Sequence, residues 1–579
     1  MITYSYDDLD RLKTIDNLGI GGVARVLLTY GYDPNGNIKS VTDTIAGTLS
    51  GTTVYDYDAL NRATQITQSG VGITNKRVTM TYNAVGQMET LQRFTGTQSV
   101  ATSTYSYSDP LNRLTQIQHA NATGTTFSSF AFTYDNGSRI KKITNADGTF
   151  VNYDYANNDE LKGADYSPTN RIDEAYTYDA NGNRTNAGYV TGGNNQLSAD
   201  AKYDYTYDDE GNLKTRRDRS TNLTRTFTWD YRNRLVGVVE GGVSIAAYSY
   251  DAGNQRISKT TGVVTTRYVY DRNHVALEFT EAATVPNIRY FYGTGVDQIL
   301  AQDKGSGNVS WQLTDQLGSV RSLVGNDGVV RNRFEYDAFG NVVSTMVGAT
   351  DDSRYRYTGR EFDAETGLNY YRARYFDSFS GRFIGQDPIG FNAGDSNLYR
   401  YVGNHPINNV DPSGLDSSCP SPPQIPHAPP SFSISRNIEA ARARPLNVWW
   451  FRDQVQNGGP WDYKQLDPAT EDRPSPYESI GNFNYGATGR ALGIPAGILE
   501  REAGRAQIAA ETSRPEFGQP GDRKDYLSGK SGWGTYGDDP NDNYWIRKGI
   551  EYYDSSNNIC HEIEKITNPK SWNWSIPLF

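Results

Sequence analysis

The chain has 579 residues, which is too long for one ordinary hydrophobic core, so it holds either several domains or a repeat. Its 42 tyrosines and 57 glycines are typical of strands joined by tight turns. The net charge of −11 argues against a protein whose main partner is a polyanion such as DNA or a phospholipid surface.

A tyrosine-aspartate phrase recurs through residues 1–415. It reads YSYDDLDRL from Tyr4, YGYDPNGNI from Tyr30 and YDYDALNRA from Tyr55, and FEYDAFGNV near residue 336 is a late copy. The second aromatic residue returns at intervals of 19 to 29 residues, which is the range of repeat architectures. These anchor positions are Tyr6, Tyr32, Tyr57, Tyr82, Tyr107, Tyr134, Tyr155, Tyr178, Tyr207, Tyr231, Tyr250 and Tyr270.

Each repeat unit is predicted to be a β-hairpin. Aromatic and polar residues alternate with period two, then Asp, Asn and Gly mark a turn, and a second strand such as 236–240 follows. A single hairpin is marginal in water, so the units are expected to pair edge to edge in one long sheet, open or closed on itself. We interpret the tyrosines as packing residues of a mainly β fold, and not as a ladder for ligand stacking.

Residues 1–415 resemble the Rhs or YD-repeat family. The similarity is densest over residues 355–415, from YRYTGREFDAETGLNYYRARYFDSFSGRFIGQDPIGF to NNVDPSGL. In that family the repeats wind into a hollow β-shell and a core segment plugs it. The resemblance therefore implies a repeat shell over residues 1–354 and an Rhs-associated core over residues 355–415.

The stretch VDPSGL at the end of the core is suited to a type I turn, with Asp, Pro and Gly at their preferred positions. The resemblance implies more: an aspartyl-type autoprotease that cuts between Leu415 and Asp416, with Arg374, Asp387 and Asp411 matching its machinery. Two carboxylates close together share a proton, so one can activate water while the other polarises the scissile carbonyl, and no cofactor is needed. The 24 residues between the two aspartates do not show that they meet.

The character of the chain changes after Leu415. Residues 416–445 form a proline-rich lead, and residues 446–579 read as one domain, mainly α or α+β. Helices are predicted over 434–444, over 496–510 and from residue 543 onward.

The phrases GPWDYK, GNFNYGATGRALGIP, LEREAGRAQ and GDDPNDNYWIRKGIEYY resemble the polymorphic toxin type 44 domain over residues 446–554. That family is a toxin cargo for which a nuclease activity has been proposed. The cargo has two histidines, His427 in the lead and His561 near the end, which argues against a two-histidine ribonuclease.

Carboxylates are the remaining candidates for toxin chemistry. Asp538 and Asp539, with Asp542 close by, could hold Mg²⁺ through oxygen ligands, and the alternative is a turn with an N-cap. Glu500 is a candidate catalytic residue, although a surface ion-pair lattice fits it as well. Asn484 and Tyr485 are expected to contact substrate from a glycine-bracketed loop.

The resemblances together predict a secreted antibacterial effector for interbacterial competition. It would be made in the cytoplasm and delivered to a neighbouring cell, by type VI secretion or another apparatus, because the first residues lack a classical signal peptide. Nowhere does an apolar run approach the roughly eighteen residues of a membrane helix, so stable membrane insertion is not expected. The expected partners are a cognate immunity protein and, as the target, nucleic acid or peptidoglycan.

Two alternatives to a nuclease effector stay open. The cargo could be a periplasmic cell-wall hydrolase, and there a Cys419–Cys560 bridge would be stable. The repeats alone would also fit a structural cell-surface array, which leaves VDPSGL and the cargo motifs unexplained.

Overall fold

The computed structural model divides into two compact units, one holding Met1–Thr81 and Glu89–Cys419 and the other holding Pro420–Glu562, and each is described by itself. The described residues are 2–19, 22–167, 171–415, 419–420, 437, 440–441, 448–456, 460–461, 478–492, 494, 499–500, 502–503, 518–519, 533–534, 543, 545–547 and 550.

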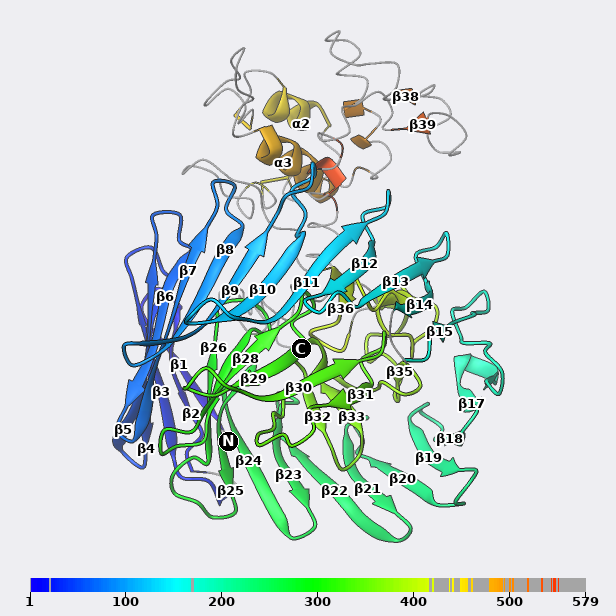
Figure 1. The fold of residues 1–579 in the computed structure, drawn as a ribbon, viewed down its shortest axis with the longest axis horizontal. Helices are drawn as coiled ribbons and strands as arrows, with labels where there is room; N and C mark the ends of the chain where they lie inside the picture. The colour runs from blue at the N-terminus through cyan, green and yellow to red at the C-terminus, as the bar shows by residue number, and fades with distance from the viewer. Residues whose placement is uncertain are drawn as a thin grey trace, which may run out of the picture. The chain divides into compact units, whose positions relative to one another are not determined.

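Two large antiparallel sheets make up most of the first unit, and in both the strands pair in chain order, as Figure 1 shows by its progression of colour. The fifteen strands of the first sheet are β1 (Thr3–Tyr6), β2 (Leu12–Asp16), β3 (Val26–Tyr32), β4 (Ile38–Ile45), β5 (Thr48–Tyr57), β6 (Ala63–Gly70), β7 (Ile73–Tyr82), β8 (Met88–Thr95), β9 (Gln98–Ser106), β10 (Gln116–Asn121), β11 (Thr126–Tyr134), β12 (Ile140–Asn145), β13 (Phe150–Tyr155), β14 (Leu161–Ser167) and β15 (Glu174–Ala175).

The second sheet has sixteen strands: β16 (Val190–Thr191), β17 (Leu197–Ala199), β18 (Tyr203–Tyr207), β19 (Leu213–Asp218), β20 (Thr224–Trp229), β21 (Leu235–Glu240), β22 (Val243–Tyr250), β23 (Arg256–Thr261), β24 (Val264–Asp271), β25 (His274–Thr280), β26 (Ile288–Tyr292), β27 (Ile299–Asp303), β28 (Val309–Thr314), β29 (Val320–Val324), β30 (Val330–Tyr336) and β31 (Val342–Thr345). The predicted hairpin array and the mainly β class of this part are confirmed.

The aspartate of the repeat phrase holds each turn together. In the turn after β5, Asp58 Oδ1 accepts the backbone N–H groups of Leu60 (2.9 Å) and Arg62 (3.0 Å), and Oδ2 accepts Nε of Arg62 (2.8 Å). Asn61, the fourth residue of the turn, has φ +60°. Gly and Asn tolerate this left-handed conformation best, which explains why the phrase continues with one of them.

The second aromatic residue of the phrase ties neighbouring hairpins together. The hydroxyl of Tyr57 donates to the Ile38 carbonyl (2.8 Å), and that of Tyr250 donates to the Leu235 carbonyl (2.7 Å). The same kind of bond is made by Tyr32, Tyr134, Tyr155, Tyr270, Tyr292 and Tyr336. These hydroxyls satisfy backbone carbonyls, as packing residues are expected to do.

Buried polar contacts join the inner faces of the two sheets. Asp43 of β4 accepts both terminal nitrogens of Arg289 of β26, with Nη2–Oδ1 at 2.9 Å. Lys76 of β7 pairs with Asp303 of β27, and burial lowers the pKa of Lys76 to about 8 although Asp303 acts in the opposite direction. These contacts fix which strand of one sheet faces which strand of the other.

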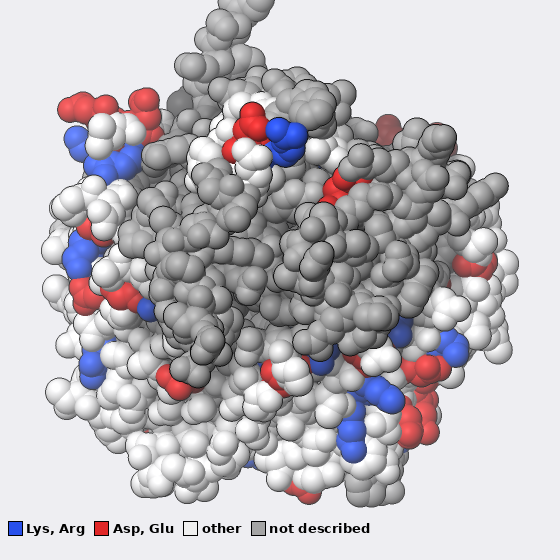
Figure 2. All heavy atoms as spheres, turned by 90° about the horizontal axis from the view of Figure 1, so that it is seen from above, with Lys and Arg blue, Asp and Glu red and all other residues white. Residues whose placement is uncertain are grey.

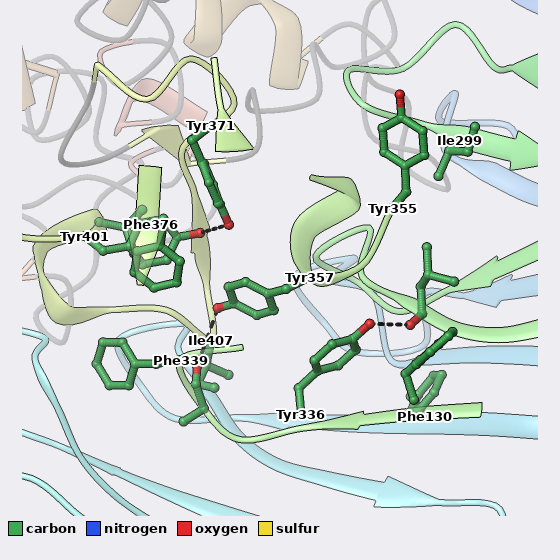
Figure 3. Packing of buried hydrophobic residues seen from close by; sticks show 14 of the residues in the cluster. Phe130, Ile299, Tyr336, Phe339, Tyr355, Tyr357, Tyr371, Phe376, Tyr401 and Ile407 are labelled. Atoms are coloured by element: carbon green, nitrogen blue, oxygen red, sulfur yellow. Dashed lines mark hydrogen bonds between the residues drawn. The ribbon is translucent and has the colours of Figure 1, made fainter. Parts of the chain in front are cut away.

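The core segment contributes short strands that pack between the sheets: β32 (Glu361–Asp363), β33 (Leu368–Tyr371), β34 (Arg374–Asp377), β35 (Arg382–Phe383) and β36 (Asn409–Val410). Its aromatic rings meet residues of both sheets in one buried cluster, where Tyr371 and Tyr401 share a hydroxyl hydrogen bond of 3.2 Å (Figure 3). Arg256 of β23 is fully buried between Glu361 and Asp363.

The second unit contains α2 (Val448–Val455), α3 (Glu478–Ala491), β38 (Gly518–Gln519) and β39 (Trp533–Gly534). Phe451, Ile480, Phe483 and Ile546 belong to its apolar cluster. Described residues within all three predicted helices, such as Ala441, are helical. Among the described helices, none is long and apolar enough to cross a membrane.

On the face shown in Figure 2, acidic and basic side chains of the described residues are interspersed. The described part of this face therefore presents no large field of one sign that would attract a polyanion.

The turn aspartates give a test of the repeat. Asp208 accepts the N–H groups of Glu210 (3.1 Å) and Asn212 (2.8 Å), whereas the adjacent Asp209 is exposed. Asp208→Ala leaves these donors unsatisfied, so we expect it to lower the free energy of unfolding by about 2 kcal/mol. Asp209→Ala removes the same charge as a matched control. Urea unfolding, monitored by tyrosine fluorescence, measures the free energy of unfolding of the two variants. Equal midpoints for the two variants would contradict this role of the turn aspartate.

Candidate functional site

One arginine connects the two candidate catalytic aspartates. Nη2 of Arg374 lies 2.9 Å from Oδ2 of Asp387 and 3.3 Å from Oδ2 of Asp411. All three side chains are buried, and the exposed fraction of Asp411 is 0%. The structure therefore brings together the three residues whose meeting the sequence spacing could not show.

The core strands place these groups. Arg374 begins β34, and Asp387 follows β35, where its N–H donates to the Leu398 carbonyl (3.0 Å). Nη1 of Arg374 donates to the same carbonyl (3.1 Å), which fixes the guanidinium beside Asp387. Asp411 directly follows β36. The site thus depends on long-range packing of the core and not on a local sequence motif.

Asp411 also organises the VDPSGL loop. Its Oδ1 accepts the N–H of Gly414 (2.8 Å) and both the N–H and the hydroxyl of Ser413 (3.2 and 3.1 Å). The hydroxyl of Ser413 in turn accepts the N–H of Leu415 (3.1 Å). One oxygen of Asp411 therefore holds the loop, while the other lies 3.3 Å from the Arg374 nitrogen that also contacts Asp387.

Only glycine fits at position 414. Gly414 has φ +71°, and a Cβ atom there would lie 2.1 Å from the Tyr371 carbonyl oxygen. The carbonyl of Gly414 accepts Nε of Arg374, so the same arginine contacts both carboxylates and the loop. The predicted cut falls one residue further, after Leu415.

Two carboxylates and one guanidinium leave this buried site with one excess negative charge if both aspartates are ionised. Removal from water penalises that charge, and a proton shared between the carboxylates relieves it. Ser413 and Leu415 line a cavity of about 1320 Å³ together with Pro388 and Ile389, so solvent space borders the loop. The arrangement can supply both a base for water and an acid for a carbonyl.

Sequence reasoning missed the turn between β33 and β34. The backbone N–H of Ala373 donates to the Ser413 carbonyl (3.2 Å), and Arg372 donates to the Pro412 carbonyl. The stretch YYRARYF contains neither Gly nor Asn, so nothing in it marks a turn. The strands on either side are buried at every position, so no alternation of buried and exposed residues marks the turn either. Asp416 lies outside the described residues.

The prediction that Asn484 and Tyr485 lie in a loop is wrong, because both lie within helix α3, and their contact with substrate stays a prediction. Asn484 is fully buried and accepts Nδ2 of Asn437 (2.9 Å), and Tyr485 donates to the Leu499 carbonyl (3.2 Å). The glycines around them serve close packing: a Cβ at Gly486 would lie 2.1 Å from the Ile546 carbonyl oxygen.

The other toxin candidates are only partly described. Glu500 accepts Nη2 of Arg547 (2.8 Å), and the side chain of Arg547 is 51% exposed. Asp538, Asp539 and Asp542 lie outside the described residues, as does Cys560, for which a bridge to Cys419 was one alternative. Within the described part of the chain, no three His, Cys, Asp or Glu side chains group as metal ligands would.

The contrast between Asn484 and Glu500 can be measured in the full chain. Asn484→Ala removes the acceptor of a buried hydrogen bond, so we expect it to destabilise α3 by about 1–3 kcal/mol. Glu500→Gln weakens a partly exposed ion pair and should cost less than about 1 kcal/mol. Hydrogen exchange of the α3 amides reports both values. Unchanged exchange in Asn484→Ala would show that the buried amide is not structural.

Two family models match separate parts of the chain. Residues 150–407 match the Teneurin YD-shell model, and residues 450–555 match the Bacterial toxin 44 model. The chain is 33% identical over 257 residues to the tRNA3(Ser)-specific nuclease WapA of Bacillus spizizenii, which covers 41% of this chain and 11% of that protein. It is 32% identical over 396 residues to the double-stranded DNA deaminase toxin A of Burkholderia cenocepacia, covering 60% of this chain and 26% of that protein.

A probable deoxyribonuclease, RhsB of Dickeya dadantii, is 29% identical over 196 residues, covering 33% of this chain and 13% of RhsB. The chain thus spans only 11% to 26% of the length of these three relatives. The crystal structure of TcdB2-TccC3 aligns with a TM-score of 0.49 at 19% identity, over 68% of this chain and 22% of that one. The hairpin sheets, the core strands and the two family matches make the chain similar to Rhs/YD-repeat proteins that carry a C-terminal polymorphic toxin segment.

Proposed function

We propose that the chain is an autoproteolytic effector that cuts itself between Leu415 and Asp416 and thereby frees residues 416–579 as a toxin. The observation that carries the proposal is the contact of one Arg374 nitrogen with both Asp387 and Asp411, beside the loop that ends at Leu415. Buried carboxylates that share a charge partner are typical of functional sites.

The proposed reaction is a hydrolysis that needs no cofactor. The ionised aspartate takes a proton from water as the water oxygen bonds to the Leu415 carbonyl carbon, while the protonated aspartate donates to the carbonyl oxygen. The tetrahedral intermediate then breaks its C–N bond, and the proton passes to the amine of Asp416. Arg374 keeps the pair anionic overall and stabilises charge that develops during the addition.

We further propose that the released segment degrades nucleic acid in a metal-dependent reaction. The Bacterial toxin 44 match and relatives named as a tRNA nuclease, a deoxyribonuclease and a DNA deaminase support a nucleic-acid target. Asp538 and Asp539 are the proposed ligands of Mg²⁺, which would activate water for attack on a phosphodiester.

Delivery into a neighbouring cell and neutralisation by a cognate immunity protein belong to the same proposal. An effector of this kind must be harmless to its producer, and the relatives are longer proteins with room for delivery segments. Secretion by a type VI or another apparatus and the target compartment are therefore part of the hypothesis.

Self-cleavage can be tested with isosteric variants of the full chain. Asp411→Asn and Asp387→Asn should each slow the cut by about 100- to 10,000-fold, because an amide cannot exchange the proton. Asp395→Asn is the matched control, since Asp395 is buried and pairs with Arg400 (2.6 Å) as Asp387 pairs with Arg374. Mass spectrometry should find fragments ending at Leu415 and beginning at Asp416. An intact 64.4 kDa wild-type chain would refute the proposal.

The toxin activity is tested by incubating the cleaved protein with total RNA and with plasmid DNA. Degradation of the nucleic acid should require added Mg²⁺ and should stop when a chelator is added. The double variant Asp538→Ala with Asp539→Ala should abolish the degradation. The Asp411→Asn chain, which should stay uncut, is the control that shows whether degradation of nucleic acid depends on the release of residues 416–579. Degradation of peptidoglycan instead, with both nucleic acids intact, would favour the wall hydrolase.

A further inference from the structure

The tight turn between β33 and β34 grips the loop that is predicted to be cut. Three consecutive residues of the turn contact three consecutive carbonyls of the loop: Arg372 contacts Pro412, the N–H of Ala373 contacts Ser413, and Nε of Arg374 contacts Gly414. We call this set the carbonyl clamp. It ends one residue before Leu415, whose carbonyl carbon is the predicted point of attack.

The turn is strained at its first residue. Tyr371 pairs with Arg374, so Arg372 and Ala373 form a two-residue hairpin turn. Arg372 has φ +58°, a left-handed conformation that costs energy for any residue with a side chain and is usually filled by glycine. A non-glycine residue persists in such a place only where the surrounding structure holds it there, and at Arg372 the contacts of the guanidinium contribute to that hold.

The guanidinium of Arg372 is anchored from the opposite side by Asp297, in the turn between β26 and β27. Nη2 of Arg372 lies 2.5 Å from Oδ1 of Asp297, and Nη1 of Arg360 lies 3.0 Å from Oδ2. Burial alone would raise the pKa of Asp297, but the two guanidiniums hold it well below its usual range. Asp297 is therefore a fixed anion that orients Arg372 toward the loop.

We propose that Arg372, oriented by Asp297, is a positioning residue for self-cleavage that presents the Leu415 carbonyl to the Arg374, Asp387 and Asp411 site. The proposal rests on the function proposed above. Among the described residues, the guanidinium of Arg372 contacts only Asp297 and the Pro412 carbonyl, so it acts through the loop and not on the reacting carboxylates.

Geometry explains why such a residue is needed. Because a peptide group is planar, Asp411 holds two peptide groups of the loop by the N–H groups of Ser413 and Gly414, and the clamp holds the same two groups by their carbonyls. The clamp fixes three successive carbonyls and hence the direction in which the chain leaves Gly414. A displacement of the reacting carbonyl by about 1 Å can slow a reaction about 100-fold.

The test separates a positioning role of Arg372 from a role in the stability of the chain, because glycine is favoured at the positive φ of this position. Arg372→Gly removes the guanidinium but relieves the positive φ, so the thermal stability of the chain should be kept while cleavage slows about 100-fold. Arg372→Lys retains a cation that can reach the Pro412 carbonyl and should restore part of the rate. Arg272→Gly serves as the matched control with an unchanged rate, because Arg272 is also the first residue of a two-residue hairpin turn, with φ +54° and an ion pair to Asp271, and lies outside the clamp.

Cleavage is followed during cell-free translation of the full chain by the disappearance of the uncut band. Low, non-denaturing guanidinium should accelerate Arg372→Gly by refilling the vacated space and should leave Asp411→Asn uncut. Asp297→Asn should slow cleavage as Arg372→Gly does, because the neutral amide orients the arginine less firmly.

The outcomes are distinguishable. Normal cleavage in Asp411→Asn would refute the autoprotease itself. A blocked Asp411→Asn together with wild-type rates in Arg372→Gly would refute only the positioning role. The positioning role would also be refuted if Arg372→Gly cleaves slowly and neither the Arg372→Lys substitution nor added guanidinium restores part of the rate. A residue with a merely structural role would behave in that way.

Discussion

Every tight turn leaves backbone N–H groups without partners in the sheet, and the repeat aspartate supplies their acceptor. Asp58 takes two such groups with one oxygen and pairs with Arg62 through the other. The turn then requires a left-handed fourth residue, which Asn61 provides. Because the Tyr57 hydroxyl bonds back to the Ile38 carbonyl, each hairpin also fixes its predecessor. Strand register is thus passed along the chain by local chemistry.

Long-range specificity comes from charges buried between the sheets and the core. Arg256 is enclosed by Glu361, Asp363 and the ring of Tyr370, whose centroid lies 4.3 Å from the guanidinium carbon. A buried ion of this kind is tolerated only where its partners are fully in place, since an unpaired charge is costly. Many apolar registers would bury equal area, but few would pair Arg256. The charges therefore select one arrangement of core against sheet.

The repeat was predictable because its information is local: period-two alternation and turn residues recur in every unit. The site was predictable only by resemblance, since Arg374, Asp387 and Asp411 meet through the packing of β34 and β36, which no spacing reveals. Sequence reasoning failed in GNFNYG for a related reason. Its glycines are typical of a loop, but the absence of a side chain at Gly486 lets helix α3 approach the Ile546 carbonyl. The two residues are sixty positions apart in the sequence.

The carbonyl clamp has a consequence for the fate of the shell. Carboxypeptidases trim a chain only when its last residues can leave the protein surface and extend in the protease groove. A chain that ended at Leu415 would have the three preceding carbonyls and the N–H groups of Ser413 and Gly414 hydrogen-bonded to buried side chains and to the Ala373 backbone. If the proposed cut occurs, the hydrogen bonds of the clamp and of Asp411 would protect such an end from exoproteolysis, so the spent shell would persist as a durable by-product.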